Sequence, residues 1–318
     1  MRKKHNRLIT EIIKLWLRLV NKSRYFEYKF QLKEQGVKMR HTEFLEGELT
    51  RIRKAIVQKK TLTFKHSGHM GDLIYALPVI KALAQNAQCE LYIQLDQRIG
   101  RNYHKHPNGN IMINQRGFLM LKPLLEHQSY LSKVAIYQGE SLDIDLDLFR
   151  KMPFALDFHS VRWYYHITGV FPSMEEPSIE VEPLPQFADK IVVVRTFRGR
   201  MPKINYHFLT QYNNVVFLGT KPEFDDFVLE VPNATFHNVS DFKELAGAIK
   251  GCKLYISNQT FAFALAEGLK VKRILEGNPY TPFVFPVGGI GTEVFFQHDF
   301  EAKVAEWITS EADLLPVT

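Results

Sequence analysis

With 318 residues and 45% hydrophobic composition, the chain is long and apolar enough to bury a large core and to form two domains. Its net charge of +7 comes from residues 1–60, which hold 17 Lys and Arg against 6 Glu, whereas residues 61–318 hold 24 Lys and Arg against 28 Asp and Glu. The charge therefore does not indicate that residues 61–318 bind nucleic acid. Cys89 and Cys252 have no CxxC spacing, which argues against a disulfide framework and a cysteine zinc site and favours a reducing cytoplasm.

Residues 1–60 are predicted to form a basic helical extension. Within it, LITEIIKLWLRLV places apolar residues on one side of a helix: Leu8, Ile12, Leu15, Trp16 and Leu19. Lys14 and Arg18 interrupt this run well short of the roughly 20 apolar residues that span a bilayer, and no secretory cleavage site follows. The apolar side is expected to pack on the body or on a second subunit, or to touch an anionic membrane peripherally through residues 1–24.

The stretch TLTFKHSGHMGDLIYALPVIKALAQN, residues 61–86, predicts a strand, a glycine turn and a helix. Thr61–His66 alternates as a strand does, Gly68 and Gly71 bracket the turn, and Asp72 opens a run with helical spacing. A glycine turn that leads into a helix N-terminus is a binding site for anions, because backbone N–H groups and the helix dipole point at the ligand.

The alternation of strands and helices continues to the end of the chain. Further strands are predicted at residues 89–95, 133–137, 191–195, 214–219, 254–257 and 271–275. Further helices are predicted at residues 118–126, 153–169, 206–212, 222–228, 242–251, 261–268 and 300–310. A polar loop with His104 and His106 is expected to be exposed, and the proline-rich residues 171–187 read as an interdomain linker.

This alternation predicts an α/β protein with parallel sheets. The expected domains are residues 61–185 and residues 186–318, which should face one another across a cleft at the carboxyl ends of their strands. The turn HSGHMGD lacks GxGxxG, and GxxxxGK[ST] is absent, which argues against a dehydrogenase and a P-loop NTPase. Residues 288–291, GGIG, are expected to form a loop.

Two stretches, GHMGDLIYALPVIKAL and CKLYISNQTFAFALAEGLKVKRILEGNPYTPF, together resemble glycosyltransferase family 9, the ADP-heptose:lipopolysaccharide heptosyltransferase group. The first matches the family's turn GDxxxxLP through Gly71, Asp72, Leu77 and Pro78. The second matches more loosely through Ser257, Asn258, Ala266, Gly268, Gly277, Thr281 and Pro282. It departs from the family at Asn258, Thr260 and Phe263, where aspartate, glycine and histidine are usual.

The resemblance implies a GT-B fold and an inverting, metal-independent glycosyltransferase without a cofactor, whose donor is a nucleotide-diphosphate sugar. The C-terminal domain would hold the donor and the N-terminal domain a glycan or glycolipid acceptor. Without a metal, helix N-termini and basic residues must neutralise the departing diphosphate. The expected substrate- and phosphate-binding residues are Gly68, His69, Gly71, Arg195, Arg198, Arg200, Ser257, Asn258, Gln259, Thr260, Phe261, Glu276 and Thr281.

Asp72 matches the family's proposed catalytic aspartate. Its alternative role is that of a plain helix N-cap, and a helix N-terminus also weakens a carboxylate as a base. His66 and His69 flank it and are further candidates for the base. His66, His69 and Asp72 also have the spacing of a metal site, although a glycine-rich turn is a poor frame for one.

Two other functions remain open on the sequence. A nucleotide-sugar epimerase of the UDP-GlcNAc 2-epimerase type would use the same two-domain cleft. A catalytically degenerate family member would bind glycans or serve assembly, and the residues at positions 258 and 263 motivate that alternative.

Overall fold

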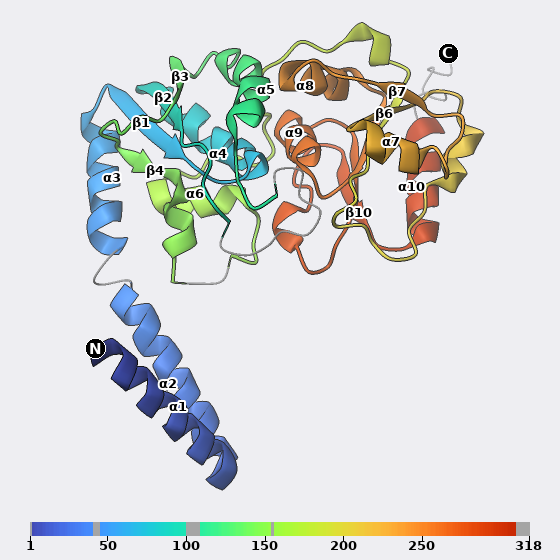
Figure 1. Ribbon diagram of the computed structural model, residues 1–318. Coiled ribbons are helices and arrows are strands. Elements are labelled where there is room, and N and C mark those ends of the chain that lie inside the picture. Colours follow the sequence, from blue (N-terminus) through green and yellow to red (C-terminus); the bar gives the residue numbers. More distant parts are fainter. Residues whose placement is uncertain (1, 41–44, 100–108, 154–155, 310–318) are drawn as a thin grey trace, which may run out of the picture. The chain divides into compact units, whose positions relative to one another are not determined.

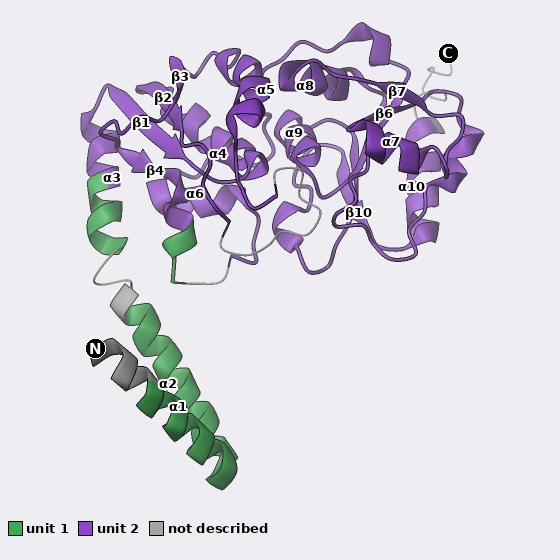
Figure 2. Ribbon diagram, in the orientation of Figure 1, with its two compact units in different colours: residues 1–51, 150–155 green, residues 52–149, 156–318 purple. Residues whose placement is uncertain are grey.

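The computed structural model describes residues 2–40, 45–99, 109–153 and 156–309 (Figure 1). Contacts within the chain divide it into two compact units (Figure 2). Unit 1 comprises residues 1–51 and 150–155, and unit 2 comprises residues 52–149 and 156–318. The loop with His104 and His106 lies outside the described residues.

Unit 1 is built on a helical hairpin. Helices α1 (Arg2–Val20) and α2 (Lys22–Arg40) run side by side (Figure 1), and α3 (Glu46–Gln58) continues into unit 2. The helices predicted in this region are therefore confirmed. In the described part of the chain, none of the helices combines the length and the hydropathy that a membrane span requires.

The first sheet of unit 2 has the order β3-β2-β1-β4, and every paired strand is parallel to its neighbour. Its strands are β1 (Thr61–His66), β2 (Gln88–Ile93), β3 (Lys133–Ile136) and β4 (Ile144–Asp145), followed by a 3-10 helix, η2 (Leu146–Lys151). Its helices are α4 (Met70–Leu83), α5 (Gln115–Glu126) and α6 (Val161–Thr168). The order reverses at β1, because β2 lies on one side of it and β4 on the other.

The second sheet has the order β10-β9-β8-β5-β6-β7, again entirely parallel. Its strands are β5 (Ile191–Val194), β6 (Val215–Leu218), β7 (Thr235–His237), β8 (Leu254–Asn258), β9 (Arg273–Glu276) and β10 (Gly291–Val294). Its α-helices are α7 (Lys221–Phe227), α8 (Phe242–Gly251), α9 (Phe261–Leu269) and α10 (Gln297–Thr309). This is the strand order of a doubly wound Rossmann sheet, whose switch point lies between β5 and β8.

Several predicted elements differ from the structure. The helix predicted at residues 153–169 occupies only Val161–Thr168, although it ends as predicted, at Gly169 with a left-handed φ of 75°. Residues 206–212 contain a 3-10 helix, η4 (His207–Gln211), instead of an α-helix. The sequence does not predict strands β4, β7 and β10. With two and three residues, β4 and β7 are too short for alternation to be detected, and β10 begins at Gly291, the last residue of the stretch expected to form a loop.

The proline-rich residues 171–187 are fixed to both halves of unit 2. The N–H groups of Ser178 and Ile179 donate to Gly268 O of α9, at 2.8 and 3.2 Å. Leu184 N donates to Gly247 O of α8 at 3.0 Å. From the other half, the hydroxyl of Tyr130 donates to Ser178 O at 2.7 Å. This segment therefore joins the halves as a hydrogen-bonded connection instead of a loose linker.

We predict that Gly251→Ala destabilises unit 2. A Cβ at Gly251 would lie 2.4 Å from Leu184 O and 2.9 Å from Leu184 N, both backbone atoms that a side-chain rotation cannot move. Overpacking of this kind costs about 1–3 kcal/mol, and a lower melting temperature in circular dichroism would report it. The matched control is Gly47→Ala in α3, where no atom lies within 4 Å of the new Cβ. Equal melting temperatures for the two variants would contradict the prediction.

Candidate functional site

The predicted turn follows the end of β1. Helix α4 begins at Met70, two residues before Asp72, where the sequence predicts the helical run to open. His69 is the N-cap of α4, in extended conformation, and Asp72 is the third residue of the helix. The alternative that Asp72 serves as the N-cap is therefore wrong. The hydroxyl of Tyr164 in α6 donates to Asp72 O at 2.7 Å and holds this first turn in place.

Side chains near β4 fix the turn before α4. Ser67 donates to Asp147 Oδ2 through its N–H at 2.8 Å and through its hydroxyl at 2.7 Å. Gly68 N donates to Nδ1 of His66 at 3.0 Å. His66 is fully buried, so its imidazole serves the turn and is poorly placed to meet an acceptor sugar.

In the second sheet, the predicted turn after β8 leads into α9. Thr260 is the N-cap of α9, and its hydroxyl accepts a hydrogen bond from Phe263 N at 3.0 Å. The hydroxyl of Ser257 donates to Asn258 O at 2.7 Å, and the ring of Phe261 packs on Phe242 at 4.5 Å between centroids. The result is an ordered turn that leaves the positive end of the α9 dipole at the switch point.

Asn258 connects this turn to the loop that follows β5. Its side chain is fully buried. Its Oδ1 accepts from Thr196 N at 3.0 Å, while its Nδ2 donates to Thr196 O at 3.0 Å and to Arg198 O at 2.6 Å. A Cβ at Gly199 would lie 3.8 Å from Cβ of Gln259, so the arginine-bearing loop and the start of α9 lie side by side.

These contacts suit an asparagine at this position, where the resemblance leads us to expect an aspartate. Only an amide donates two N–H bonds and accepts a third bond at the same time. An ionised carboxylate in this place would face two carbonyl oxygens.

Arg195 and Glu276, both predicted to contact the donor, lie inside the C-terminal half. Arg195 is buried, with its Nε 3.0 Å from Glu276 Oε2 and its Nη1 3.0 Å from Glu230 Oε1. Its guanidinium also donates to Ile204 O at 2.9 Å and stacks on the ring of Tyr206 at 4.3 Å. Because these partners occupy the guanidinium and the carboxylate, we assign Arg195 and Glu276 to a structural network and not to the donor site.

The other two predicted arginines lie on the loop surface. Arg200 pairs with Asp226 at 2.7 Å, donates to Thr196 O at 2.9 Å and lies over the ring of Phe197 at 5.1 Å. Arg198 is partly exposed on the same loop.

The loop with Thr281 is held to the N-terminal half. The hydroxyl of Thr281 donates to Asn278 O at 3.2 Å within the loop. Ser160, which precedes α6, donates to Phe283 O through its N–H at 2.8 Å and through its hydroxyl at 2.9 Å. Thr281 therefore lies in a loop that also contacts the N-terminal half.

The helices that leave the two switch points contact each other. A Cβ at Gly71 in α4 would lie 3.9 Å from Cβ of Ala264, one turn into α9. The two helix N-termini therefore approach one another from opposite halves. This contact brings the turn of Asp72 close to the turn of Thr260.

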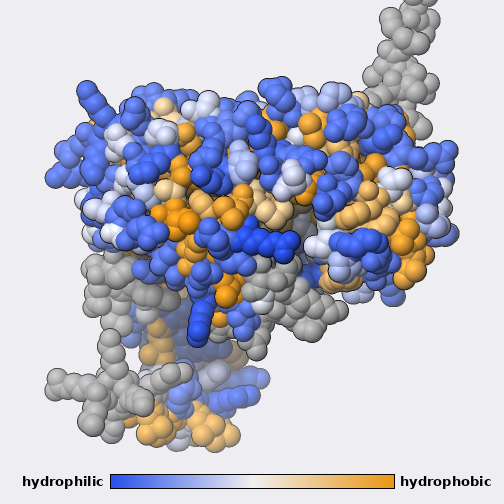
Figure 3. Space-filling view, turned by 45° about the horizontal axis from the view of Figure 1, so that its top comes forward, coloured by the Kyte–Doolittle hydropathy of each residue, from blue (hydrophilic) through white to orange (hydrophobic). Residues whose placement is uncertain are grey.

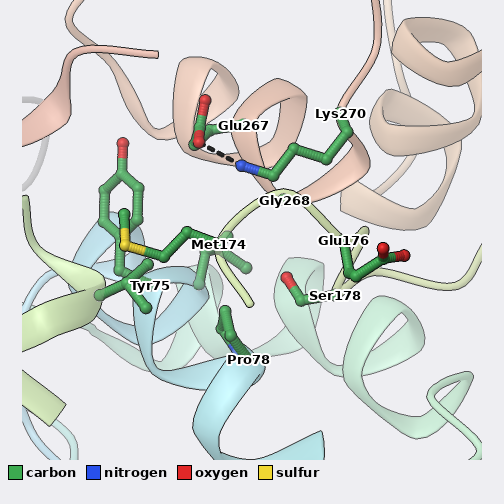
Figure 4. A pocket seen from close by; sticks show the side chains of 10 residues that line it. Tyr75, Pro78, Met174, Glu176, Ser178, Glu267, Gly268 and Lys270 are labelled. Carbon is green, nitrogen blue, oxygen red and sulfur yellow. Dashed lines mark hydrogen bonds and ion pairs between the residues drawn. The ribbon is translucent and has the colours of Figure 1, made fainter. Parts of the chain in front are cut away.

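A small hollow lies further along α4 and α9 (Figure 4). Its lining includes Tyr75, Met174, Ser178, Glu267 and Lys270, and the last two form an ion pair. Asp72 and the predicted donor residues do not line it. The sequence analysis did not single out Glu267 or Lys270, although a glutamate inside an apolar helical run was a signal that could have found them.

Among the described residues, no three His, Cys, Asp or Glu side chains lie close enough together to hold a metal ion. His66, His69 and Asp72 thus do not form such a group.

No family model matches the sequence, and no curated protein matches it. Among solved structures, a glycosyltransferase of family 9 from Veillonella parvula matches with a TM-score of 0.52 at 14% identity, over 81% of this chain and 90% of that one. The chain has the fold of glycosyltransferase family 9. The predicted resemblance to that family and the predicted GT-B fold of two Rossmann-like halves are therefore confirmed.

Two E. coli structures match this chain at lower TM-scores. ADP-heptose lps heptosyltransferase II has 10% identity over 80% of this chain and 99% of that one, with a TM-score of 0.47. Heptosyltransferase WaaC with ADP-2-deoxy-2-fluoro heptose has 12% identity over 77% of this chain and 99% of that one, with a TM-score of 0.45.

We predict that Asn258→Asp detaches the loop after β5. The variant loses both side-chain N–H donors, to Thr196 O and to Arg198 O, and places a carboxylate against these carbonyls. Arg200 Nε still donates to Thr196 O at 2.9 Å, so the expected cost is that of two lost hydrogen bonds, about 0.5–1.5 kcal/mol each. The melting temperature should fall, and residues 196–200 should exchange their amide hydrogens faster. Asn278→Asp is the matched control, because the side-chain oxygen of Asn278 only accepts, from Tyr280 N at 3.0 Å. If Asn258→Asp is as stable as this control, the assignment is wrong.

A second prediction concerns His159, which lies against Tyr75 near the hollow, at 5.5 Å between ring centroids. Burial, with Lys270, Arg273 and Arg162 nearby, lowers the pKa of His159 to about 3. The imidazole is therefore neutral at neutral pH, and its Nε2, 3.8 Å from Glu267 Oε1, forms no ion pair. The unfolded chain has a histidine pKa of about 6.5, so it binds a proton that the native state does not.

Stability should therefore fall as the pH is lowered from about 6.5 toward about 3, by up to about 1.4 kcal/mol per pH unit. His159→Asn should reduce this slope in melting temperatures recorded from neutral to acidic pH. His298→Asn removes a histidine whose side chain is 94% exposed and should keep the wild-type slope. Identical slopes for wild type and His159→Asn would contradict the prediction.

Proposed function

We propose that this protein is an inverting glycosyltransferase that moves a sugar from a nucleotide-diphosphate donor to a glycan or glycolipid acceptor. The observation that carries the proposal is the approach of α4 and α9 at Gly71 and Ala264. It places the first turn of α4, which carries Asp72, near the start of α9, which lies beside the arginine-bearing loop after β5. The fold shared with a glycosyltransferase of family 9 supports the same reaction class.

The donor diphosphate would bind where the loop after β5 meets the start of α9. Helix N-termini attract phosphate through backbone N–H groups and the helix dipole. Arg198 adds positive charge on the same loop, where Arg200 is already paired with Asp226. Asn258 holds that loop against the end of β8. Charge on the departing diphosphate is thus neutralised by protein groups, and the proposed reaction needs neither a metal ion nor another cofactor.

Asp72 is the proposed base. The acceptor hydroxyl oxygen bonds to the anomeric carbon as the bond from that carbon to the diphosphate oxygen breaks, and the hydroxyl proton passes to the Asp72 carboxylate. Attack opposite the leaving group inverts the anomeric centre. The helix dipole makes Asp72 a modest base, which suffices when the proton leaves late and the carboxylate is well positioned.

Of the two positions that suggested a non-catalytic protein, 258 and 263, the first now has a structural explanation. Asn258 departs from the family because it fastens the loop through three hydrogen bonds, which is a structural reason for the change. The epimerase alternative differs in outcome, because it converts the donor to an epimer when no acceptor is present.

Two measurements test the proposal, first for donor binding and then for transfer. A nucleoside diphosphate that binds the native state should raise the melting temperature, so ADP, UDP, GDP and dTDP are screened first. Transfer from the matching nucleotide sugar is then followed for wild type and Asp72→Asn. Loss of a general base lowers the rate by about 10²–10⁴-fold, while the nucleotide-induced shift in melting temperature should persist.

The matched control is Asp299→Asn, which removes an exposed acidic residue from the first turn of α10 and should keep full transfer activity. A wild-type rate for Asp72→Asn would remove Asp72 from the mechanism. The absence of a thermal shift with all four nucleotides would overturn the proposed function, and an epimer formed without acceptor would replace it with the epimerase reaction.

A further inference from the structure

Helix α1 presents a row of large apolar side chains to solvent. The hairpin in which they lie is at the bottom of Figure 3, where hydrophobic surface appears in orange. The row follows one face of the helix, and each side chain is more than half exposed: Leu8 62%, Ile12 59%, Leu15 62%, Trp16 60% and Leu19 79%.

The contact between α1 and α2 does not cover this row. Helices α1 and α2 contact each other, and a different stripe of α1, with Ile13 and Leu17, is partly buried, as are Tyr28 and Leu32 of α2. Because successive residues of an α-helix are 100° apart around its axis, this stripe lies on a different side of α1 from the row centred on Ile12. The hairpin thus uses one side of α1 for its own packing and leaves the other available to an occupant.

The charge around this row identifies the occupant. Residues 2–40 contain twelve Lys and Arg and only three Glu. One of these, Glu11, pairs with Lys14 at 2.8 Å. Arg18, next to the row on α1, and Lys22, at the start of α2, are exposed. An apolar face flanked by excess positive charge complements a surface that is apolar inside and negatively charged at its rim.

We propose that α1 binds the surface of an anionic lipid bilayer, lying in its plane. Leu8, Ile12, Leu15 and Leu19 would enter the acyl boundary, and Trp16 would place its indole at the headgroup level. Lysine and arginine stems extend along the helix so that their charges reach the phosphates. The helix lies flat over about 28 Å. A second copy fits the same face less well, because two such hairpins would bring their excess positive charges together.

The test measures binding of the full chain to vesicles. Vesicles of phosphatidylcholine and phosphatidylglycerol in equal parts should bind the protein and shift the Trp fluorescence to shorter wavelength, whereas phosphatidylcholine alone should bind it more weakly. Added salt should weaken binding to the anionic vesicles. The double variant Leu15→Glu/Leu19→Glu should weaken binding more than about tenfold. Because both side chains are exposed, this variant should keep the wild-type melting temperature.

The matched control is Leu229→Glu, which changes a leucine of unit 2 that is 82% exposed and should leave vesicle binding unchanged. Equal loss in this control, or no vesicle binding by the wild type, would overturn the proposal. So would a dimer that Leu15→Glu/Leu19→Glu dissociates while anionic vesicles bind neither protein, since the occupant would then be a second copy. Vesicle binding is measured without nucleotide or sugar, so a failure of this proposal can be told apart from a failure of the proposed glycosyltransferase activity.

Discussion

The candidate site depends on the three hydrogen bonds of one buried amide. Asn258 lies at the end of β8 and holds both the N–H and the carbonyl of Thr196, together with the carbonyl of Arg198. A loop of mixed arginine and glycine has no regular structure of its own, so its place beside α9 depends on side-chain contacts, and this amide supplies three of them. Buried backbone groups need partners, and here one residue provides partners for three of them at the switch point of the sheet.

Buried ion pairs give the C-terminal half its internal order and separate structural from surface arginines. Arg195 is surrounded by Glu276, Glu230 and Tyr206. Arg273, fully buried, pairs with Glu267 at 2.6 Å and also donates to Gly288 O at 2.9 Å. A buried charge requires a partner and further hydrogen bonds. These groups therefore fix the loops after β9 and β5.

The two proposals assign different tasks to two surfaces of this chain. The switch points of unit 2 would offer helix N-termini and arginines to a small anionic ligand, and the apolar row of α1 would offer area and positive charge to a lipid surface. A glycolipid acceptor is itself held in a membrane, so the two proposals are compatible. They remain separate in physical terms, because one rests on hydrogen bonds and helix dipoles and the other on apolar burial with long-range charge.

The sequence by itself determined the fold class, the amphipathic helix and the two turns that define the candidate site. Each of these follows from local patterns: the alternation in Thr61–His66, the spacing of Leu8 to Leu19, and glycines next to a helix start. Short strands such as β4, with two residues, were beyond this method. They exist only because a neighbouring strand pairs with them.

Only the tertiary structure decided which polar side chains are held in internal contacts and which lie at the surface. Arg195, Arg198 and Arg200 look equivalent in the sequence RTFRGR, yet Arg195 continues β5 into the core and meets Glu276 from β9, which lies 81 residues away. Asn258 appeared to be a departure from a family pattern until its partners, about 60 residues earlier in the chain, were in place. The physical reason is that burial and hydrogen-bond partners are properties of long-range contacts, which local periodicity does not record.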